Sequence, residues 1–384
     1  MLTEKELEAA IQKITNRLDE INILFIKKIA AQISKIGEMN ATSINRIIIM
    51  TDMGTDIREI SKELAAATAM NIRDIYKIYQ TALDDCYTDP RFKTALESQP
   101  LTAEQNAQIT KLAQNVSTQT AQTMQNLSNT TVISNTYQEA VDKAILATSS
   151  GLTSYQEAAR DIIQQMGYNG LQVQYESGYH RRLDTAVRQN IIDGVNQINQ
   201  NASLAMGEAL GFDAVEISAH ANSAPDHEPV QGRVFLKSEF NKMQAGQACY
   251  DVDGNRYAGF KRPIGEWNCM HIAMGFSTQH SVRRYTDEQL KQWKEDNARG
   301  CEIAGKHYTT YQARQLMRAL ETKVRREKDA ANAARLNGND MDARRACQRK
   351  INKLSSQYYA VASASGLSPR RARLNVEGFK MVKV

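Results

Sequence analysis

Residues 3–33, TEKELEAAIQKITNRLDEINILFIKKIAAQI, place apolar side chains at steps of three and four residues. These positions are Leu7, Ile11, Ile14, Leu18, Ile21, Phe25, Ile29 and Ile33. Such steps return side chains to one face of an α-helix, so the stretch predicts an amphipathic helix. Thr3 and Glu6 have the spacing of a capping box at its start. The chain is therefore expected to begin with a long helix.

The same spacing continues to about Leu83, with expected breaks at Gly37 and Gly54, and predicts a helical hairpin or bundle. Residues 101–138 are rich in Gln, Asn, Thr and Ser and carry almost no charge. They predict a long polar helix, and a disordered linker is the alternative. We therefore expect residues 1–139 to form a helical N-terminal arm.

Helix and strand signals mix from about residue 140 onward. Alternating apolar residues at 171–175 and 214–218 indicate strands on either side of a helix over about 179–210. The chain from 220 to 275 is rich in proline and glycine, which indicates loops. We expect a compact α+β central domain over 140–285 that contains this loop-rich His/Cys segment.

Positive charge gathers in the last third of the chain. A helix start at Thr286 precedes a long charged helical pattern over 308–362 that is interrupted near Gly338. We predict a basic helical C-terminal region over 286–384. Its candidate nucleic-acid contacts are Arg325, Arg326, Lys328, Arg344, Arg345, Arg349 and Lys350. Basic clusters of this kind bind phosphate backbones, and a solvated helix face is the open alternative.

The composition limits the class of protein. With 384 residues, 42% hydrophobic and 24% charged, the chain is expected to be globular, with two or three structural units. A net charge of +5 is modest, so a surface for polyanions must be local. No apolar run approaches the ~20 residues that span a bilayer, so no membrane partner is expected. Five scattered cysteines, an odd number, indicate free thiols and a reducing compartment. The charged start, MLTEKE, is not typical of a signal peptide, so a cytoplasmic protein is expected.

The loop-rich segment holds the one dense group of metal-capable residues in the sequence, His220, His227, Cys269 and His271. Four nitrogen and sulfur ligands suit tetrahedral zinc, but their spacing is not that of a zinc finger or a zincin helix. We therefore expect no cofactor and keep zinc as an alternative. The preferred interpretation is that these side chains hydrogen-bond and order the loops. No catalytic residue is assigned, because the sequence has neither a phosphate-binding loop nor a deaminase motif.

Two stretches, SAHANSAPDHEPVQGRVF at 218–235 and GEWNCMH at 265–271, resemble the phage minor capsid protein family of the minor capsid protein 2 type. That family belongs with the Mu F-like head-morphogenesis proteins, and the likeness covers roughly residues 137–375. The motif residues, for which the resemblance implies a structural role, are His220, Pro225, His227, Gln231, Gly232, Trp267, Asn268, Cys269 and His271. The family commonly has an aromatic residue in place of Val230 and a basic one in place of Met270.

The resemblance implies a predominantly helical α+β structural protein of a tailed-phage head, and not an enzyme. It implies a place in the head interior or at the portal vertex, after assembly in the host cytoplasm. The implied partners are the portal protein, other head proteins and packaged double-stranded DNA, with roles in head morphogenesis and in DNA packaging or ejection. Two alternatives stay open. One is an effector enzyme delivered with the DNA, with its site around His220 and His271, and the other is a DNA-binding virion protein.

Overall fold

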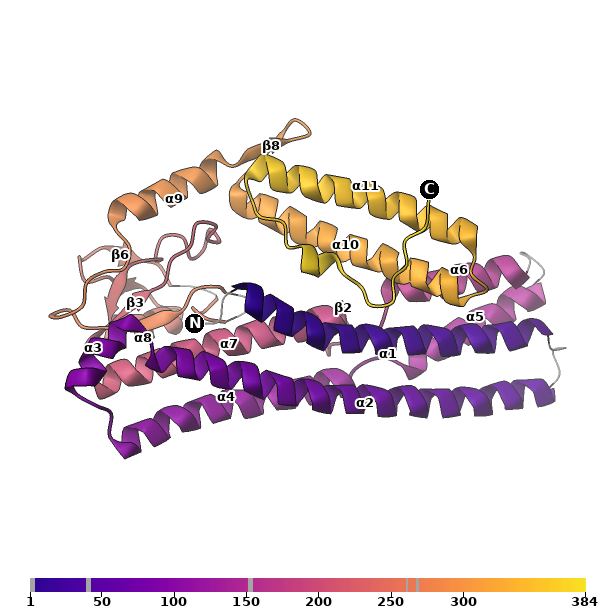
Figure 1. Cartoon of the computed structure of the whole chain (residues 1–384), viewed down its shortest axis with the longest axis horizontal. Helices are drawn as coiled ribbons and strands as arrows, with labels where there is room; N and C mark the ends of the chain where they lie inside the picture. The colour runs from indigo at the N-terminus through magenta and orange to yellow at the C-terminus, as the bar shows by residue number, and fades with distance from the viewer. Residues whose placement is uncertain (1–3, 39–42, 151–154, 260–261, 267–268) are drawn as a thin grey trace. The chain divides into compact units, whose positions relative to one another are not determined.

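The structure is a computed structural model that describes residues 4–38, 43–150, 155–259, 262–266 and 269–384. Most of these residues are helical, and the strands are short (Figure 1). The α-helices are α1 (Glu4–Glu38), α2 (Ser43–Tyr87), α3 (Pro90–Ser98), α4 (Ala103–Asn129), α5 (Ser134–Ser150), α6 (Tyr155–Asn169), α7 (Leu183–Ala209), α8 (Lys237–Gln244), α9 (Asp287–Arg299), α10 (Thr310–Leu336) and α11 (Met341–Ser365). The predominantly helical α+β class predicted from the sequence is confirmed.

The strands form one three-stranded sheet and three two-stranded hairpins in the described part of the chain. They are β1 (Gln172–Gln174), β2 (His180–Arg182), β3 (Ala214–Ile217), β4 (Val234–Leu236), β5 (Cys249–Tyr250), β6 (Arg256–Tyr257), β7 (Ala273–Phe276), β8 (Cys301–Ile303) and β9 (Lys306–Tyr308). Both predicted strands are present as β1 and β3. A 3-10 turn (Arg371–Leu374) follows α11.

Residues of the chain group into two compact units, each drawn from three separate ranges. Unit 1 comprises Met1–Ala10, Arg73–Thr123 and Gln189–Gln315. Unit 2 comprises Ile11–Ile72, Met124–Arg188 and Leu316–Val384. The division of the sequence at residues 139 and 285 stays a prediction.

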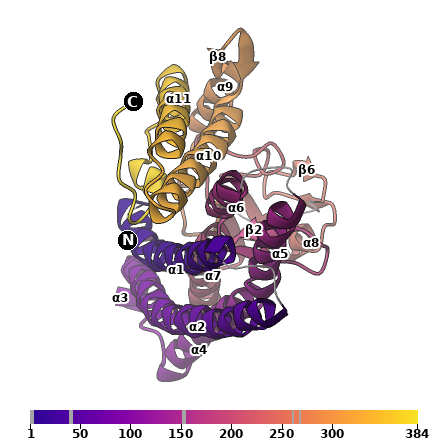
Figure 2. The same ribbon diagram turned by 90° about the vertical axis from the view of Figure 1, so that its right-hand side faces the viewer.

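In unit 2, α1 from Ile11 onward and α2 as far as Ile72 lie side by side and form the expected helical hairpin (Figures 1 and 2). The apolar face of α1 is buried as its periodicity predicts, with Ile11, Ile14, Phe25, Ile29 and Ile33 fully inaccessible. Across the hairpin, Lys28 lies 3.1 Å from Asp56, and Lys35 lies 2.7 Å from Asp52.

The expected break at Gly54 is wrong, because α2 runs through this residue without interruption. Glycine in a helix interior costs about 1 kcal/mol relative to alanine, which is too little to end a helix held by its neighbours. Asp52 and Asp56, on either side of Gly54, are both paired with lysines of α1. Tertiary contacts therefore override the local preference.

The polar segment at 101–138 contains the predicted long helix, α4. Its buried residues, Ile109, Ala113, Val116, Thr120, Met124 and Leu127, recur at steps of three and four. A capping box begins it, because the backbone N–H of Gln105 donates to the Thr102 hydroxyl at 3.2 Å, and that of Thr102 donates to the Gln105 side chain at 2.8 Å. The linker alternative does not apply to this stretch.

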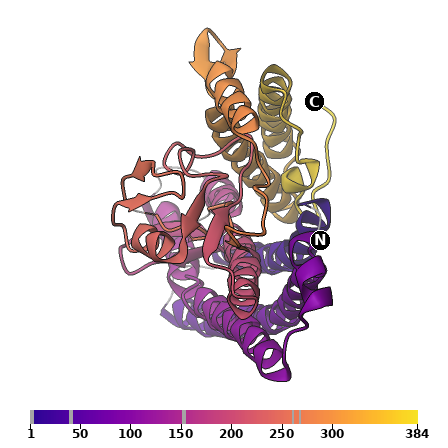
Figure 3. The same cartoon turned by 90° about the vertical axis from the view of Figure 1, so that its left-hand side faces the viewer.

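The central sheet of unit 1 has the order β4-β3-β7, with both pairs antiparallel. Figure 3 shows α8 beside these strands. Val215, Ile217, Phe235, Phe240 and Met243 form a core cluster between the sheet and α8. The sheet is small, and the loops that hold the two sequence motifs begin at its ends.

Unit 2 contains a buried cluster of charged side chains. Arg182 donates through Nε to Asp184 at 3.2 Å and through Nη2 to Asp329 at 2.6 Å, and Arg325 donates to the other oxygen of Asp184. All four residues are less than 10% exposed. Burial, together with the nearby Asp329 carboxylate, raises the pKa of Asp19 to about 8. The cluster joins β2, α7 and α10 through charge pairs that water does not screen.

Candidate functional site

The end of β3 and the start of β7 bring the two family motifs together. Ile217 pairs with Ala273, so the loop that leaves β3 and the loop that enters β7 begin at the same end of the sheet. The backbone N–H of Ser218 donates to the Ile272 carbonyl at 2.9 Å, and the Ile272 N–H donates to the Ser218 hydroxyl at 2.8 Å. Residues about 50 positions apart in the sequence thus become neighbours.

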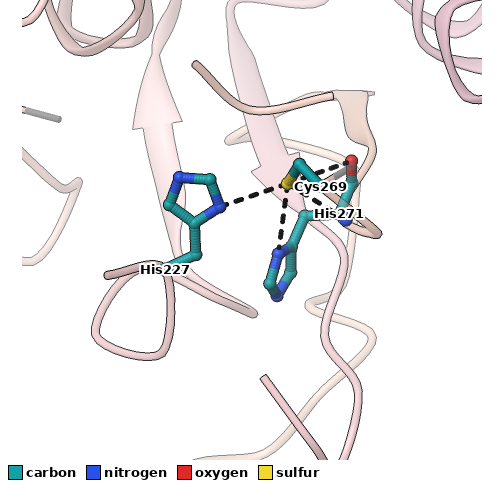
Figure 4. Close-up of side chains that lie close together, drawn as sticks. All are labelled: His227, Cys269 and His271. Atoms are coloured by element: carbon teal, nitrogen blue, oxygen red, sulfur yellow. Dashed lines mark hydrogen bonds between the residues drawn. The ribbon is translucent and has the colours of Figure 1, made fainter. Parts of the chain in front are cut away.

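Three of the four predicted metal ligands lie close together in the structure (Figure 4). They are His227, Cys269 and His271. The Cys269 Sγ lies 3.1 Å from Nδ1 of His227 and 3.5 Å from Nδ1 of His271. All three side chains are at most 2% exposed. His220 is half-buried and stacks its ring on that of His271, with centroids 4.5 Å apart. The structure therefore brings all four together, but only three point ligand atoms at one another.

The outer ring nitrogens of the two convergent histidines face oxygen atoms. Nε2 of His227 lies 2.8 Å from the Arg262 carbonyl. Nε2 of His271 lies 3.4 Å from Oε1 of Gln231 and 3.2 Å from the Ser223 hydroxyl. Hydrogen bonds to these oxygens fix the orientation of both rings and leave each Nδ1 directed at Cys269.

The cluster is uncharged at neutral pH. Burial lowers the pKa of His227, and it holds the pKa of His271 well below its usual range. Burial, and then the positive charge of Arg314, lowers the pKa of His220 to about 4. Burial raises the pKa of the Cys269 thiol. A reactive cysteine needs an accessible thiolate, so this arrangement favours a structural or ligand role over nucleophilic catalysis.

The remaining motif residues shape the loop that follows β3. Gly232 has a φ of +67°, and a Cβ there would lie 2.8 Å from the Leu290 side chain, so the position requires glycine. Its N–H donates to the Ile217 carbonyl at 2.8 Å. Pro225 lies exposed in the turn that precedes His227. Trp267 and Asn268 lie outside the described residues.

Sequence reasoning missed four polar residues that hold these loops. Arg262 binds Asp226 with two hydrogen bonds of 3.0 and 2.8 Å. From α7, Asn196 donates to the Cys269 carbonyl at 3.0 Å, and Gln200 accepts from the Ala273 N–H at 3.0 Å. The spacing of Asn196 and Gln200, four residues apart on a helix, was the one available signal, because it places two amides on the same face.

The predicted nucleic-acid contacts differ in burial. Arg325 and Arg344 are each 8% exposed, and both have partners inside unit 2. Lys328 donates to the Leu374 carbonyl at 2.7 Å, and the Arg326 guanidinium lies over the Tyr168 ring at 5.5 Å from its centroid. These four side chains already make contacts that stabilise the fold.

The other three candidates, Arg345, Arg349 and Lys350, are exposed on α11. Lys350 lies 3.5 Å from Glu327. Arg345, Arg349 and the exposed Lys353 are spaced four residues apart, which places all three on one side of the helix. We call Arg345, Arg349 and Lys353 the basic face of α11.

These features define a mainly helical α+β protein whose central polar cluster is buried. The family model of phage minor capsid protein 2 matches residues 2–360. The chain therefore belongs to the phage minor capsid protein 2 family, which confirms the resemblance seen in the central motifs. It is a structural protein of the phage virion.

No curated protein and no solved structure matches the chain. Among the described residues, every helix is too short or too polar to cross a bilayer.

Proposed function

We propose that the protein lies inside the head at the portal vertex, acts in head morphogenesis, and binds packaged double-stranded DNA along the basic face of α11. The main support for this proposal is that a member of a phage capsid family has an exposed basic face on α11. Arg345 and Lys353 are eight residues apart, a helical rise of about 12 Å, over which one B-DNA strand presents about three or four phosphates. The face therefore matches a polyanion in both charge and length.

The charge balance of α11 favours a polyanion partner over a merely solvated face. The helix contains five basic residues and one acidic residue, Asp342. Solubilising surfaces usually intersperse charges of both signs. Of the other two basic residues, Arg344 is buried and Lys350 pairs with Glu327 of α10. All three residues of the basic face are exposed, and Arg345 lies 3.7 Å from Asp342 of the same helix.

Replacing Arg345, Arg349 and Lys353 together by alanine is expected to weaken DNA binding by the full-length protein. The slope of log K against log salt should fall in magnitude by about 0.9 for each phosphate that the variant no longer neutralises. Fluorescence anisotropy with a DNA duplex over a range of salt concentrations measures both effects. Because the residues are exposed, thermal stability should change little.

The matched control replaces Lys291, Lys294 and Arg299, three exposed basic residues of α9, by alanine. It removes the same charge from a different helix. DNA binding should keep most of its affinity and its salt slope. An equal loss in both triple variants would show that net charge alone drives binding, and would contradict the assignment to α11.

The position in the virion is tested with the full chain, because unit 2 takes segments from Ile11–Ile72, Met124–Arg188 and Leu316–Val384. A fragment of residues 1–139 would lack most of those partners. Cross-linking mass spectrometry of purified, nuclease-treated heads is expected to find the chain joined to the portal protein. Its absence from filled heads, or cross-links confined to the outer shell, would contradict the proposal.

A structural role has more support than the effector-enzyme alternative. Cys269, the one nucleophilic side chain of the central cluster, is 1% exposed, and burial raises its pKa. Gln231 and His271 are buried beside it. Side chains that substrate cannot reach are better suited to holding two loops together than to catalysis.

A further inference from the structure

We propose that His227, Cys269 and His271 bind one soft divalent transition-metal ion of the Zn²⁺ class. This site is separate from the DNA-binding and portal-docking roles proposed above, and it stands or falls independently of them. Imidazole nitrogen and thiolate sulfur are the ligands that zinc prefers. Three features of the cluster favour such an ion: the number of protons it holds, its geometry and its outer hydrogen bonds.

The outer hydrogen bonds determine which ring nitrogens carry protons. A backbone carbonyl only accepts, so Nε2 of His227 must donate its proton to the Arg262 carbonyl, 2.8 Å away. The His220 backbone N–H donates to Oε1 of Gln231 at 3.1 Å, which identifies that atom as an acceptor. Nε2 of His271 faces this acceptor at 3.4 Å and the Ser223 hydroxyl at 3.2 Å. The hydroxyl itself donates to the Ala224 carbonyl at 3.3 Å, so it too can accept, and Nε2 of His271 is assigned the proton. In a neutral imidazole, each Nδ1 is then left with a lone pair.

Two imidazole lone pairs thus meet a single thiol. The Cys269 Sγ lies 3.1 Å from one Nδ1 and 3.5 Å from the other, but a thiol has only one proton to share. The three side chains are almost fully buried, so bulk water has little access to the cluster. A cation at the centre satisfies both lone pairs and the sulfur at once.

The geometry fits a tetrahedral ion closely. Zinc bonds of about 2.0–2.1 Å to nitrogen and about 2.3 Å to sulfur separate the two ligand atoms by about 3.5 Å at a tetrahedral angle. The two nitrogen-to-sulfur distances of 3.1 and 3.5 Å are within a few tenths of an ångström of that value. All three ligand atoms lie within 4.8 Å of one another. The two sulfur-to-nitrogen distances therefore suit a tetrahedral ion.

The surroundings have the outer shell of a metal site. Histidine ligands of zinc usually donate their second ring N–H to a carbonyl or carboxylate, as His227 does to Arg262 and His271 to Gln231. The His271 backbone N–H donates to the Cys269 sulfur at 3.4 Å, which favours its thiolate form. On binding, the Zn–S bond replaces the S–H bond, and the thiol proton leaves to solvent. No electron is transferred.

Metal analysis of the full-length protein, purified under reducing conditions from zinc-supplemented cells, is expected to find about one zinc per chain. Replacing zinc by Co²⁺ should give the ligand-field bands of a tetrahedral ion and a thiolate-to-cobalt charge-transfer band. Cys269→Ser and His271→Ala should lose most of the zinc. Gln231→Ala should retain the site but bind zinc about 10–100-fold more weakly.

Cys301→Ser is the matched control, because Cys301 is also a buried thiol of unit 1 but lies outside the cluster. It should keep its zinc, as should His220→Ala, since that ring only stacks on His271. The wild-type cobalt spectrum reports the thiolate even if a variant fails to fold. A folded wild-type protein with neither zinc nor a cobalt charge-transfer band would overturn the proposal, and so would full zinc content in Cys269→Ser.

Discussion

Replacing Asp184 by asparagine is expected to lower the free energy of unfolding by about 3–5 kcal/mol, the usual cost of removing one partner from a buried ion pair. Asp184 accepts from Arg182 and Arg325, and all three residues are less than 10% exposed. Asparagine keeps the shape of the side chain but removes its charge, which leaves the Arg325 guanidinium buried without its carboxylate. Urea unfolding at neutral pH, followed by circular dichroism, measures the loss.

The pH dependence provides a second check on this result. Burial alone would raise the pKa of Asp184, but the positive charges of Arg325 and Arg182 outweigh it and hold the pKa well below its usual range. A carboxyl with a lowered pKa stabilises the fold above its unfolded-state pKa of about 3.9 and loses that contribution as the pH falls below it. The difference in stability between wild type and Asp184→Asn should therefore shrink in strong acid.

Asp342→Asn is the control for removing a charge from the surface. Asp342 is 94% exposed in its side chain and lies 3.7 Å from Arg345. Exposed pairs contribute little, so the change in the free energy of unfolding should stay within about 0.5 kcal/mol. Equal effects of the two substitutions would mean that water screens the Asp184 cluster, contrary to its burial.

The helices were predictable because their signal is local. The apolar steps of α1, the N-cap at Thr286 and the interruption near Gly338 all depend on residues within one or two turns of the chain. The Thr286 hydroxyl accepts from the Gln289 N–H at 3.2 Å, as an N-cap residue should. The hairpins β5–β6 and β8–β9 were missed, since their strands of two or three residues lack the longer alternation that revealed β1 at residues 171–175.

Burial of charged residues was not predictable, because it depends on distant partners. Arg325 stands in the basic run RREK, where nothing in the local sequence distinguishes it from the exposed basic residues of α11. Its carboxylate partner, Asp184, lies 141 positions earlier. The residue types of the central cluster were predicted. Their convergence depends on the pairing of β3 with β7, which the sequence does not reveal.

Gly194→Ala is expected to cost about 3 kcal/mol or more in the free energy of unfolding, at the upper end of overpacking effects. A Cβ at Gly194, in α7, would lie 1.7 Å from the Tyr79 hydroxyl oxygen and 2.4 Å from the Cζ of its ring. Tyr79 is 1% exposed, and its hydroxyl lies 3.1 Å from that of Thr120. Because the methyl group would overlap the Tyr79 ring, the helix or the ring must shift to admit it. Thermal or urea unfolding measures the cost.

Gly54→Ala tests the same substitution where the space is open. Gly54 also lies inside a helix, but a Cβ there meets nothing within 4 Å. Alanine should therefore stabilise the protein by about 0.5–1 kcal/mol, the ordinary difference in helix propensity. Adding Tyr79→Leu should recover part of the loss in Gly194→Ala, because the double variant removes the ring that the new methyl group meets. If Gly54→Ala and Gly194→Ala changed the free energy of unfolding in the same direction, helix propensity and not close packing would determine the outcome. Strictly additive costs in the double variant of Gly194 and Tyr79 would lead to the same conclusion.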